Sequence, residues 1–207
     1  MTNLNTAVAG WGPQPPQTRK GFGGLHFRSD SIEDLIAQLK EPIRFAGSAF
    51  VICAAAGDYA AGDVLSNSAT DTLGVPTYVP SLARSPGGVV QLVAVRAVCA
   101  ASNGAVLAQV RLHWFHTDPL AAEVEMDDNA AFSIATAAGS FKWVGSTLLN
   151  PFVDRGAVVS TSDTPLSPIE PYRCAPDKDG LWFVAVLENA EANESANMSF
   201  KYDFYTL

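Results

Sequence analysis

The residues whose side chains could most readily take part in chemistry lie in one run, 111–118, which holds two of the chain's three histidines. Imidazole nitrogens bind zinc and similar ions, so His113 and His116 are candidate metal ligands. The run is also typical of a β-strand, in which side chains alternate between faces, so residues three apart point in opposite directions. The third histidine, His26, lies far away in the sequence. We therefore expect partly buried strand histidines here and no metal site.

Carboxylates gather in two other places, 123–128 and 177–180. Neither place has the alternating oxygen ligands and closing glutamate of a calcium loop, and Asp-Gly at 179–180 is itself a turn signal. Glu123, Glu125 and Asp127 have strand-like spacing and are imaginable as a glycosidase pair, but chain spacing does not define the separation that such a mechanism needs. We expect solvated turns in both places.

Motifs for nucleophilic or phosphate chemistry are missing from the sequence. Three glycine-serine pairs lack the second glycine of a nucleophile elbow, and the glycines of 21–24 lack the Lys-Ser/Thr end of a phosphate loop. Cys53, Cys99 and Cys174 are odd in number and form no CxxC pair, which favours small buried thiols. The sequence predicts no catalytic residue, no metal and no cofactor.

Composition excludes several classes of partner. The 207 residues carry 13 Lys and Arg against 21 Asp and Glu, a net charge of -8, and 48% of them are hydrophobic. Such a chain can fold around a core, but it lacks the basic stripe that binds nucleic acid or anionic membranes. No apolar run approaches the roughly 20 residues of a membrane span, and the N-terminus does not resemble a signal peptide. We expect a protein made in a cytoplasm.

Residues 1–42 differ in composition from the remainder. Prolines and glycines are frequent up to residue 30, which predicts an extended arm because neither residue continues a helix or a sheet interior. The arm nevertheless carries Trp11, Phe22 and Phe27. Two arrangements stay open: the arm folds back over its own domain, or it lies on a neighbouring subunit.

A short α-helix is predicted at the end of this region, over 31–42. Ser31 or Asp30 can cap the first amides, acidic residues follow in the first turn, and Pro42 ends the helix. Its apolar stripe is expected to pack on a sheet or a partner, since an isolated helix of this length is marginal in water. The stripe consists of Ile32, Leu35, Ile36 and Leu39.

From residue 43 onward the pattern indicates β-strands separated by turn residues. Strands are predicted at 43–55, 87–101, 105–116, 130–137, 140–149, 156–161, 180–190 and 197–207. No helical pattern separates them, which predicts one antiparallel sandwich or barrel over 43–207. The evenly apolar 87–101 should be central, and 197–207 should bury one face. The proline-rich stretch 162–168 is predicted to be a loop.

Four segments carry a resemblance to known proteins. They are GDYAAGDVL at 57–65, VRLHWFHTDP at 110–119, DDNAAFSI at 127–134, and LWFVAV at 181–186 before a closing strand. In this order they resemble a family of small β-sandwich structural proteins of tailed bacteriophages. The resemblance covers roughly residues 45–207 and consists of turn and strand motifs.

The resemblance implies a jelly-roll-like sandwich without enzymatic activity that decorates or cements the outer surface of a capsid as a homotrimer. Its partner would be the major capsid protein, and its location the virion surface after synthesis in the host cytoplasm. The added residues 1–42 and the proline-rich loop depart from the family pattern and leave head, tail and fibre positions open. The residues expected to fasten the protein to its partner are Trp11, Phe22, Phe27, Ile32, Leu35, Ile36 and Leu39.

Two other functions compete with decoration. A tail or fibre module could bind host carbohydrate if Trp114, Trp143 or Trp182 formed a stacking platform, although a tryptophan within a strand more often belongs to the core. A small hydrolase would depend on Glu123 or Glu125.

Overall fold

The computed structural model describes residues 43–53, 58–66, 76–101, 108–156, 158–189 and 198–207, without the side chains of 167–170, and the backbone of β1 (Arg19–Lys20) and β2 (His26–Phe27). By its internal contacts the chain divides into Met1–Pro42 and Ile43–Leu207. In the first unit, β1 and β2 pair in antiparallel fashion. The predicted helix at 31–42 lies outside the described residues, as do Trp11, Phe22, Ile32, Leu35, Ile36, Leu39 and the side chain of Phe27.

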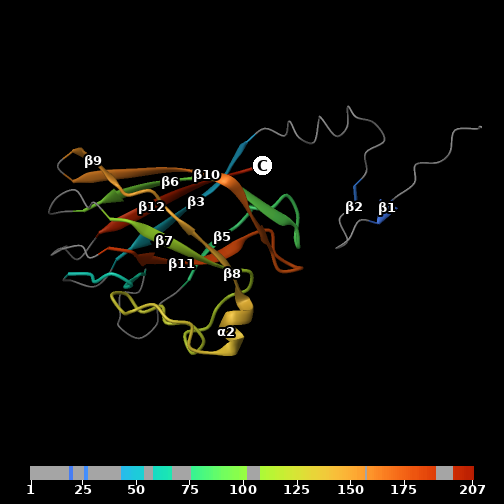
Figure 1. The fold of residues 1–207 in the computed structure, drawn as a ribbon, viewed down its shortest axis with the longest axis horizontal. Helices are drawn as coiled ribbons and strands as arrows, with labels where there is room; N and C mark the ends of the chain where they lie inside the picture. The colour runs from blue at the N-terminus through green and yellow to red at the C-terminus, as the bar shows by residue number, and fades with distance from the viewer. Residues whose placement is uncertain are drawn as a thin grey trace, which may run out of the picture. The chain divides into compact units, whose positions relative to one another are not determined.

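The second unit consists of two antiparallel sheets packed face to face (Figure 1). The first sheet has the order β3 (Arg44–Ile52), β12 (Ser199–Thr206), β6 (Val89–Ala100), β10 (Val159–Arg173) and β9 (Val153–Gly156). The second sheet has the order β4 (Val64–Leu65), β11 (Leu181–Leu187), β7 (Val110–Phe115) and β8 (Trp143–Leu148), and β5 (Thr77–Val79) also pairs with β11. The predicted all-β antiparallel sandwich is confirmed.

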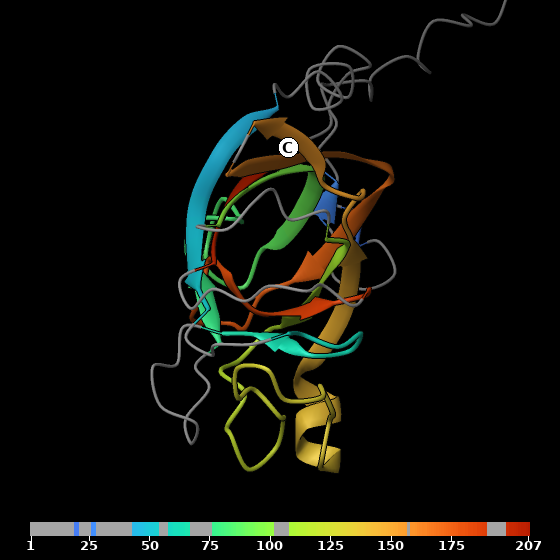
Figure 2. The same ribbon diagram turned by 90° about the vertical axis from the view of Figure 1, so that its left-hand side faces the viewer.

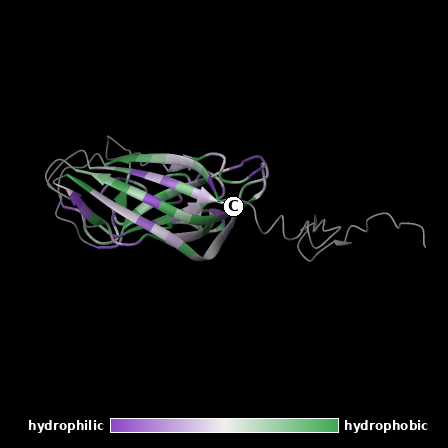
Figure 3. Ribbon diagram, turned by 90° about the horizontal axis from the view of Figure 1, so that it is seen from above, coloured by the Kyte–Doolittle hydropathy of each residue, from purple (hydrophilic) through white to green (hydrophobic). Residues whose placement is uncertain are grey.

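The core between the sheets is rich in aromatic side chains. Trp114 of the second sheet lies edge-on to Phe183 and to Phe204 of the first sheet, with ring centroids 5.6 and 5.5 Å apart. Such pairs add about 0.5–1.5 kcal/mol each beyond the area that they bury. Along β12, Phe200, Tyr202 and Phe204 are buried in alternation, so the prediction of one buried face is confirmed. Hydropathy alternates along the strands in Figure 3.

Two further predictions about the core are confirmed. The strand predicted at 87–101 corresponds to β6, which occupies the middle of the first sheet. Cys53, Cys99 and Cys174 are buried free thiols.

The segment 116–136, between β7 and α2 (Ala137–Lys142), covers part of the outer face of the second sheet (Figures 1 and 2). There Val124 and Met126 form a second apolar cluster with Val184 and Val186 of β11. The strand predicted at 130–137 is wrong, because this part of the segment makes isolated bridges only. The apolar residues of this segment pack on the face of the sheet and do not extend the sheet by another strand.

The start of the next predicted strand, 140–149, is also wrong. Thr136 caps α2 by accepting a hydrogen bond from the Gly139 amide at 3.1 Å, and the helix continues to Lys142. A threonine at the N-cap satisfies an amide that the first turn leaves free, which favours a helix locally. Strand β8 therefore begins at Trp143.

The proline-rich stretch 162–168 belongs to a strand and not to a loop, so that prediction is wrong. Strand β10 runs through it, and its pairing with β6 shifts in register between Pro165 and Glu170. Proline has no amide hydrogen to donate, and an irregularity in the ladder is where a strand tolerates it. Strand β9 forms a hairpin with the beginning of β10, so the strand predicted at 156–161 spans two strands.

Candidate partner-binding face

The outer face of the first sheet carries several large apolar side chains that are more than half exposed. Ile43, Phe45, Phe50 and Ile52 are 56–62% exposed. Single exposed apolar residues are common on protein surfaces, but several from one strand form a patch of the kind that marks an interaction site. The matching face of the second sheet is partly covered by 116–136, and its large apolar side chains Trp143 and Leu148 are only 41% and 39% exposed. The two outer faces of the sandwich therefore differ, and the first is the candidate site.

The geometry of β3 explains why these side chains share a face. Phe50 and Ile52 are two residues apart and project to the same side, opposite Lys201 and Ser199 of β12. The register between the strands shifts near Phe204, which places Phe45 opposite Tyr205 and on that same side. The Phe45 and Tyr205 rings meet edge-on with centroids 5.8 Å apart.

A polar row crosses the same face at right angles to the strands. Asp163, Arg96, Asp203 and Ser48 are successive partners across β10, β6, β12 and β3. Arg96 Nε lies 3.6 Å from Asp163 Oδ1, and Lys201 Nζ lies 2.8 Å from Asp203 Oδ1. Apolar groups lie on both sides of this row, so the face combines apolar contact area with charges that can orient a partner.

The carboxylate of Asp203 is the most constrained charge of the row. Burial alone would raise the pKa of Asp203, but hydrogen bonds from Lys201 and Ser48 outweigh that effect and lower it. Asp203 therefore remains ionised at neutral pH.

A hollow of about 410 Å³ lies beside the row. Ile43, Ala94, Pro165 and Tyr205 give it an apolar lining, and Arg96 and Asp163 stand at one side. A hollow of this kind accepts one or two apolar side chains of a partner, the usual anchor of a protein interface.

The two histidines singled out from the sequence do not meet. The His113 ring lies over the second sheet, with its centroid 4.2 Å from that of Phe132 and 6.4 Å from that of Trp143. Burial and the nearby Arg111 guanidinium lower the pKa of His113 to about 4. His116 Nε2 lies 3.2 Å from the carbonyl oxygen of Phe141.

The carboxylates of 123–128 have separate partners. Glu123 pairs with Lys142 at 2.6 Å, and Asp128 accepts a hydrogen bond from the Tyr59 hydroxyl at 2.8 Å. Glu125 accepts a hydrogen bond from the backbone amide of Asp127 at 3.1 Å. Across the described residues, no group of three or more His, Cys, Asp or Glu side chains could hold a metal ion.

The three tryptophans considered as sugar platforms occupy different environments. Trp114 is fully buried and belongs to the core. Trp182 is half-buried, with its ring 4.5 Å from that of Tyr78. Trp143 is 41% exposed, so of the three it has the most accessible ring.

The apolar residues of the face were not singled out from the sequence. The signal was present in β3, where Ala49 and Val51 occupy one parity while Phe50 and Ile52 occupy the other. A strand with large apolar residues on both sides either lies deep in a protein or faces a partner. Strand β3 stands at the end of the order of its sheet, so its exposed apolar side is a candidate contact surface.

The fold and the face define the chain as an all-β antiparallel sandwich with an apolar outer face. Comparison with protein-family models, with curated proteins and with solved structures finds no match. No helix among the described residues is long and apolar enough to cross a membrane.

Proposed function

We propose that this protein is a non-enzymatic structural protein of a tailed-bacteriophage virion, a decoration or cement protein. It binds the major capsid protein on the outer surface of the head as a homotrimer and stabilises the head. The observation that carries the proposal is the outer face of the first sheet, with apolar side chains on both sides of a polar row. A protein built to remain alone in solution has little reason to expose them.

We further propose that the sandwich is a jelly roll. Its support is the strand order: β3, β12, β6 and β10 form one run of neighbours, and β4, β11, β7 and β8 form the other. Strands that follow one another in the chain thus cross repeatedly between the sheets, as two Greek keys require, and β5 and β9 are additions. Jelly rolls occur in viral capsid proteins and in lectins, so the fold is compatible with the proposed function without selecting it.

In this proposal, residues 1–42 supply a second contact to the capsid. The arm and the face belong to one molecule, so each contact raises the effective concentration of the other, and neither alone is expected to hold the protein on the capsid. Ordering a segment on binding costs entropy but lets a small protein cover a large surface.

The proposal is tested by measuring the mass of the purified protein in solution and its co-sedimentation with capsids that lack it. We expect a trimer that sediments with the capsids. Removal of residues 1–42 should abolish sedimentation while circular dichroism still reports a folded sandwich. A stable oligomer that ignores capsids contradicts decoration, and undiminished binding by the shortened protein contradicts the role of the arm.

The exposure of Trp143 favours a second candidate, a tail or fibre module that binds host carbohydrate. An exposed indole can stack on a sugar ring. Binding to a glycan array that disappears in W143A, together with absence of capsid binding, would favour this function over the first.

A further inference from the structure

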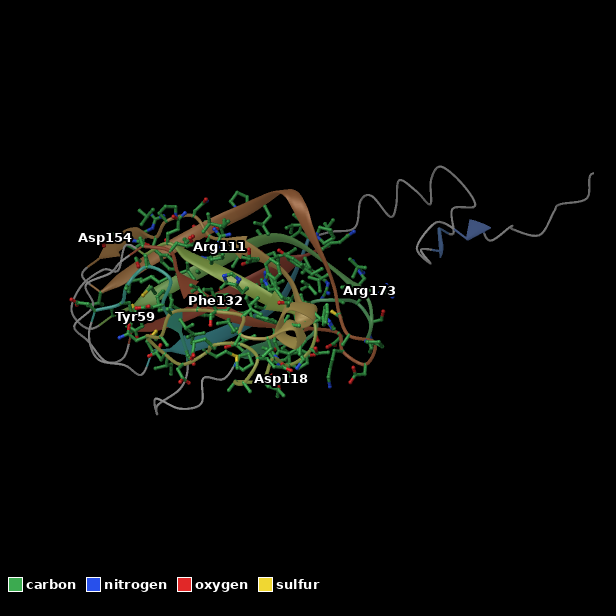
Figure 4. All side chains as sticks on the ribbon, turned by 60° about the horizontal axis from the view of Figure 1, so that its bottom comes forward. Tyr59, Arg111, Asp118, Phe132, Asp154 and Arg173 are labelled. Carbon is green, nitrogen blue, oxygen red and sulfur yellow. The ribbon has the colours of Figure 1, made fainter. Side chains whose placement is uncertain are left out.

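A second hollow of about 410 Å³ opens where the two sheets meet at one end of the sandwich. Arg173 and Cys174 line it from the end of β10, Val144 from β8, and His116 from the residue that follows β7. Figure 4 shows Arg173 at the end of the sandwich opposite to Asp154 and Tyr59. We call this hollow the end cleft, and it shares no lining residue with the hollow of the partner-binding face.

The guanidinium of Arg173 is the dominant charge of the end cleft. Nearby carboxylates have other partners: Asp177 pairs with Lys178 at 3.3 Å, and Asp179 accepts a hydrogen bond from the Tyr78 hydroxyl at 3.3 Å. Within the described part of the chain, the Arg173 side chain forms neither a hydrogen bond nor an ion pair. Arg173 is exposed, so its guanidinium is accessible to an anion from outside.

The imidazole of His116 adds a second polar group. A backbone carbonyl can only accept, so the 3.2 Å contact with Phe141 assigns the ring hydrogen to Nε2 of His116. The imidazole thus contributes a polar edge to a lining that is otherwise mostly apolar.

The remaining lining is apolar or uncharged. Val144, Ala175 and Pro176 supply hydrocarbon, and Cys174 contributes a thiol. Burial, helped by the charge of Asp179, raises the pKa of Cys174 to about 11, so the thiol stays neutral. The cleft therefore offers positive charge on one side and apolar surface on the other, and its volume suits a small ligand.

We propose that the end cleft binds an organic carboxylate with a small apolar body, held by Arg173 through paired hydrogen bonds. An inorganic anion would leave the apolar lining without contacts. Two sources offer the required chemistry, a free small acid and the C-terminal carboxylate of a peptide. The inference does not rest on the decoration function, since it concerns other residues.

The test is a titration of the full-length protein followed by amide chemical shifts in NMR. One arm uses benzoate with benzamide as its neutral analogue, and the other uses N-acetyl-Ala-Leu with its C-terminal amide. We expect at least one acid to bind more tightly than about 10 mM, with shifts around 116 and 173–176, and its amide to bind at least about tenfold more weakly. Stronger binding of benzoate assigns a free acid, and stronger binding of the dipeptide assigns a peptide end.

Variants assign the binding to the end cleft. R173M should weaken binding about tenfold to hundredfold, because a hydrogen-bonded charge pair is lost. R155M removes an exposed arginine of β9 and should bind as the native protein does, and both variants should melt within a few degrees of it. Equal affinity for acid and amide, equal affinity of R173M and native protein, or no binding by either acid would overturn the proposal. None of these results bears on capsid binding, so the two proposals fail separately.

Discussion

Thr147 connects the two sheets through buried hydrogen bonds, and its replacement by valine should weaken the sandwich. Its hydroxyl accepts from the indole N–H of Trp114 at 2.9 Å and lies 3.1 Å from the phenol oxygen of Tyr172. Trp114 and Thr147 belong to the second sheet, and Tyr172 belongs to the first. All three side chains are buried, so water does not replace a lost partner.

The expected cost follows from the group left behind. Valine has nearly the shape of threonine, so T147V creates no large cavity but leaves the indole N–H of Trp114 without its acceptor. A buried donor without a partner costs about 1–3 kcal/mol. In a protein of this size that corresponds to a fall in Tm of about 2–12 °C.

Thermal unfolding followed by circular dichroism measures this effect, with T147S as the matched control. Serine retains the hydroxyl and loses one methyl group, so T147S should lose about 1 kcal/mol. The reasoning is refuted if T147V melts with the native protein, or if T147S loses as much stability as T147V.

Two further changes test other parts of the fold. The pKa of His113 is lowered from its ordinary value of 6.5 to about 4, so between pH 6.5 and pH 4 the unfolded chain binds a proton that the folded chain does not. The free energy of unfolding should therefore fall by about 1–3 kcal/mol as the pH drops through this range, and by less in H113Q. Urea unfolding at each pH measures this difference. Equal pH dependence of the two proteins would contradict this. Gly145 has φ of +148°, and an added Cβ would lie 2.7 Å from Tyr172 Cε1, whereas Gly156 has φ of +151° and open space. G145A should therefore melt lower than G156A, and equal melting would show that the contact with Tyr172 is unimportant.

The elements that could be predicted from sequence are those whose burial pattern is local. In β12 the alternation of Phe200, Tyr202 and Phe204 with polar residues defines a strand and its buried face within eight residues. In β6 the apolar run itself indicates a central position. These patterns need no knowledge of the partner strands.

The wrong predictions concern segments whose conformation depends on contacts with residues far away in the sequence. Residues 130–137 have a strand-like composition, but they make only isolated bridges, Ala131 with Asp63 and Ile134 with Val124, while Phe132 packs against the second apolar cluster. Prolines at 165 and 168 indicate a loop when the sequence is considered alone. In the structure, a register shift in the pairing of β10 with β6 accommodates them in a strand. Composition alone does not show whether a segment covers the face of a sheet or pairs with one of its strands.

The apolar pattern of β3 was a sequence signal for part of the candidate face, but the rest of the face could not be predicted because it depends on register. Ser48 and Asp203 are 155 residues apart in sequence and become neighbours only when β3 pairs with β12. Phe45 joins the exposed side because of one shift in that pairing. The end cleft likewise combines Arg173 and His116, which no motif connects.

The central claim, that the face of β3 binds the capsid, is tested most directly by comparing F50D with F141D in co-sedimentation with capsids that lack the protein. Both substitutions replace an exposed phenylalanine by aspartate, one on the face and the other on α2. The account predicts that F50D loses at least about tenfold in affinity, as expected when an apolar contact is replaced by a charge, while F141D binds as the native protein does. Native-like binding by F50D, or equal loss by F141D, would contradict it.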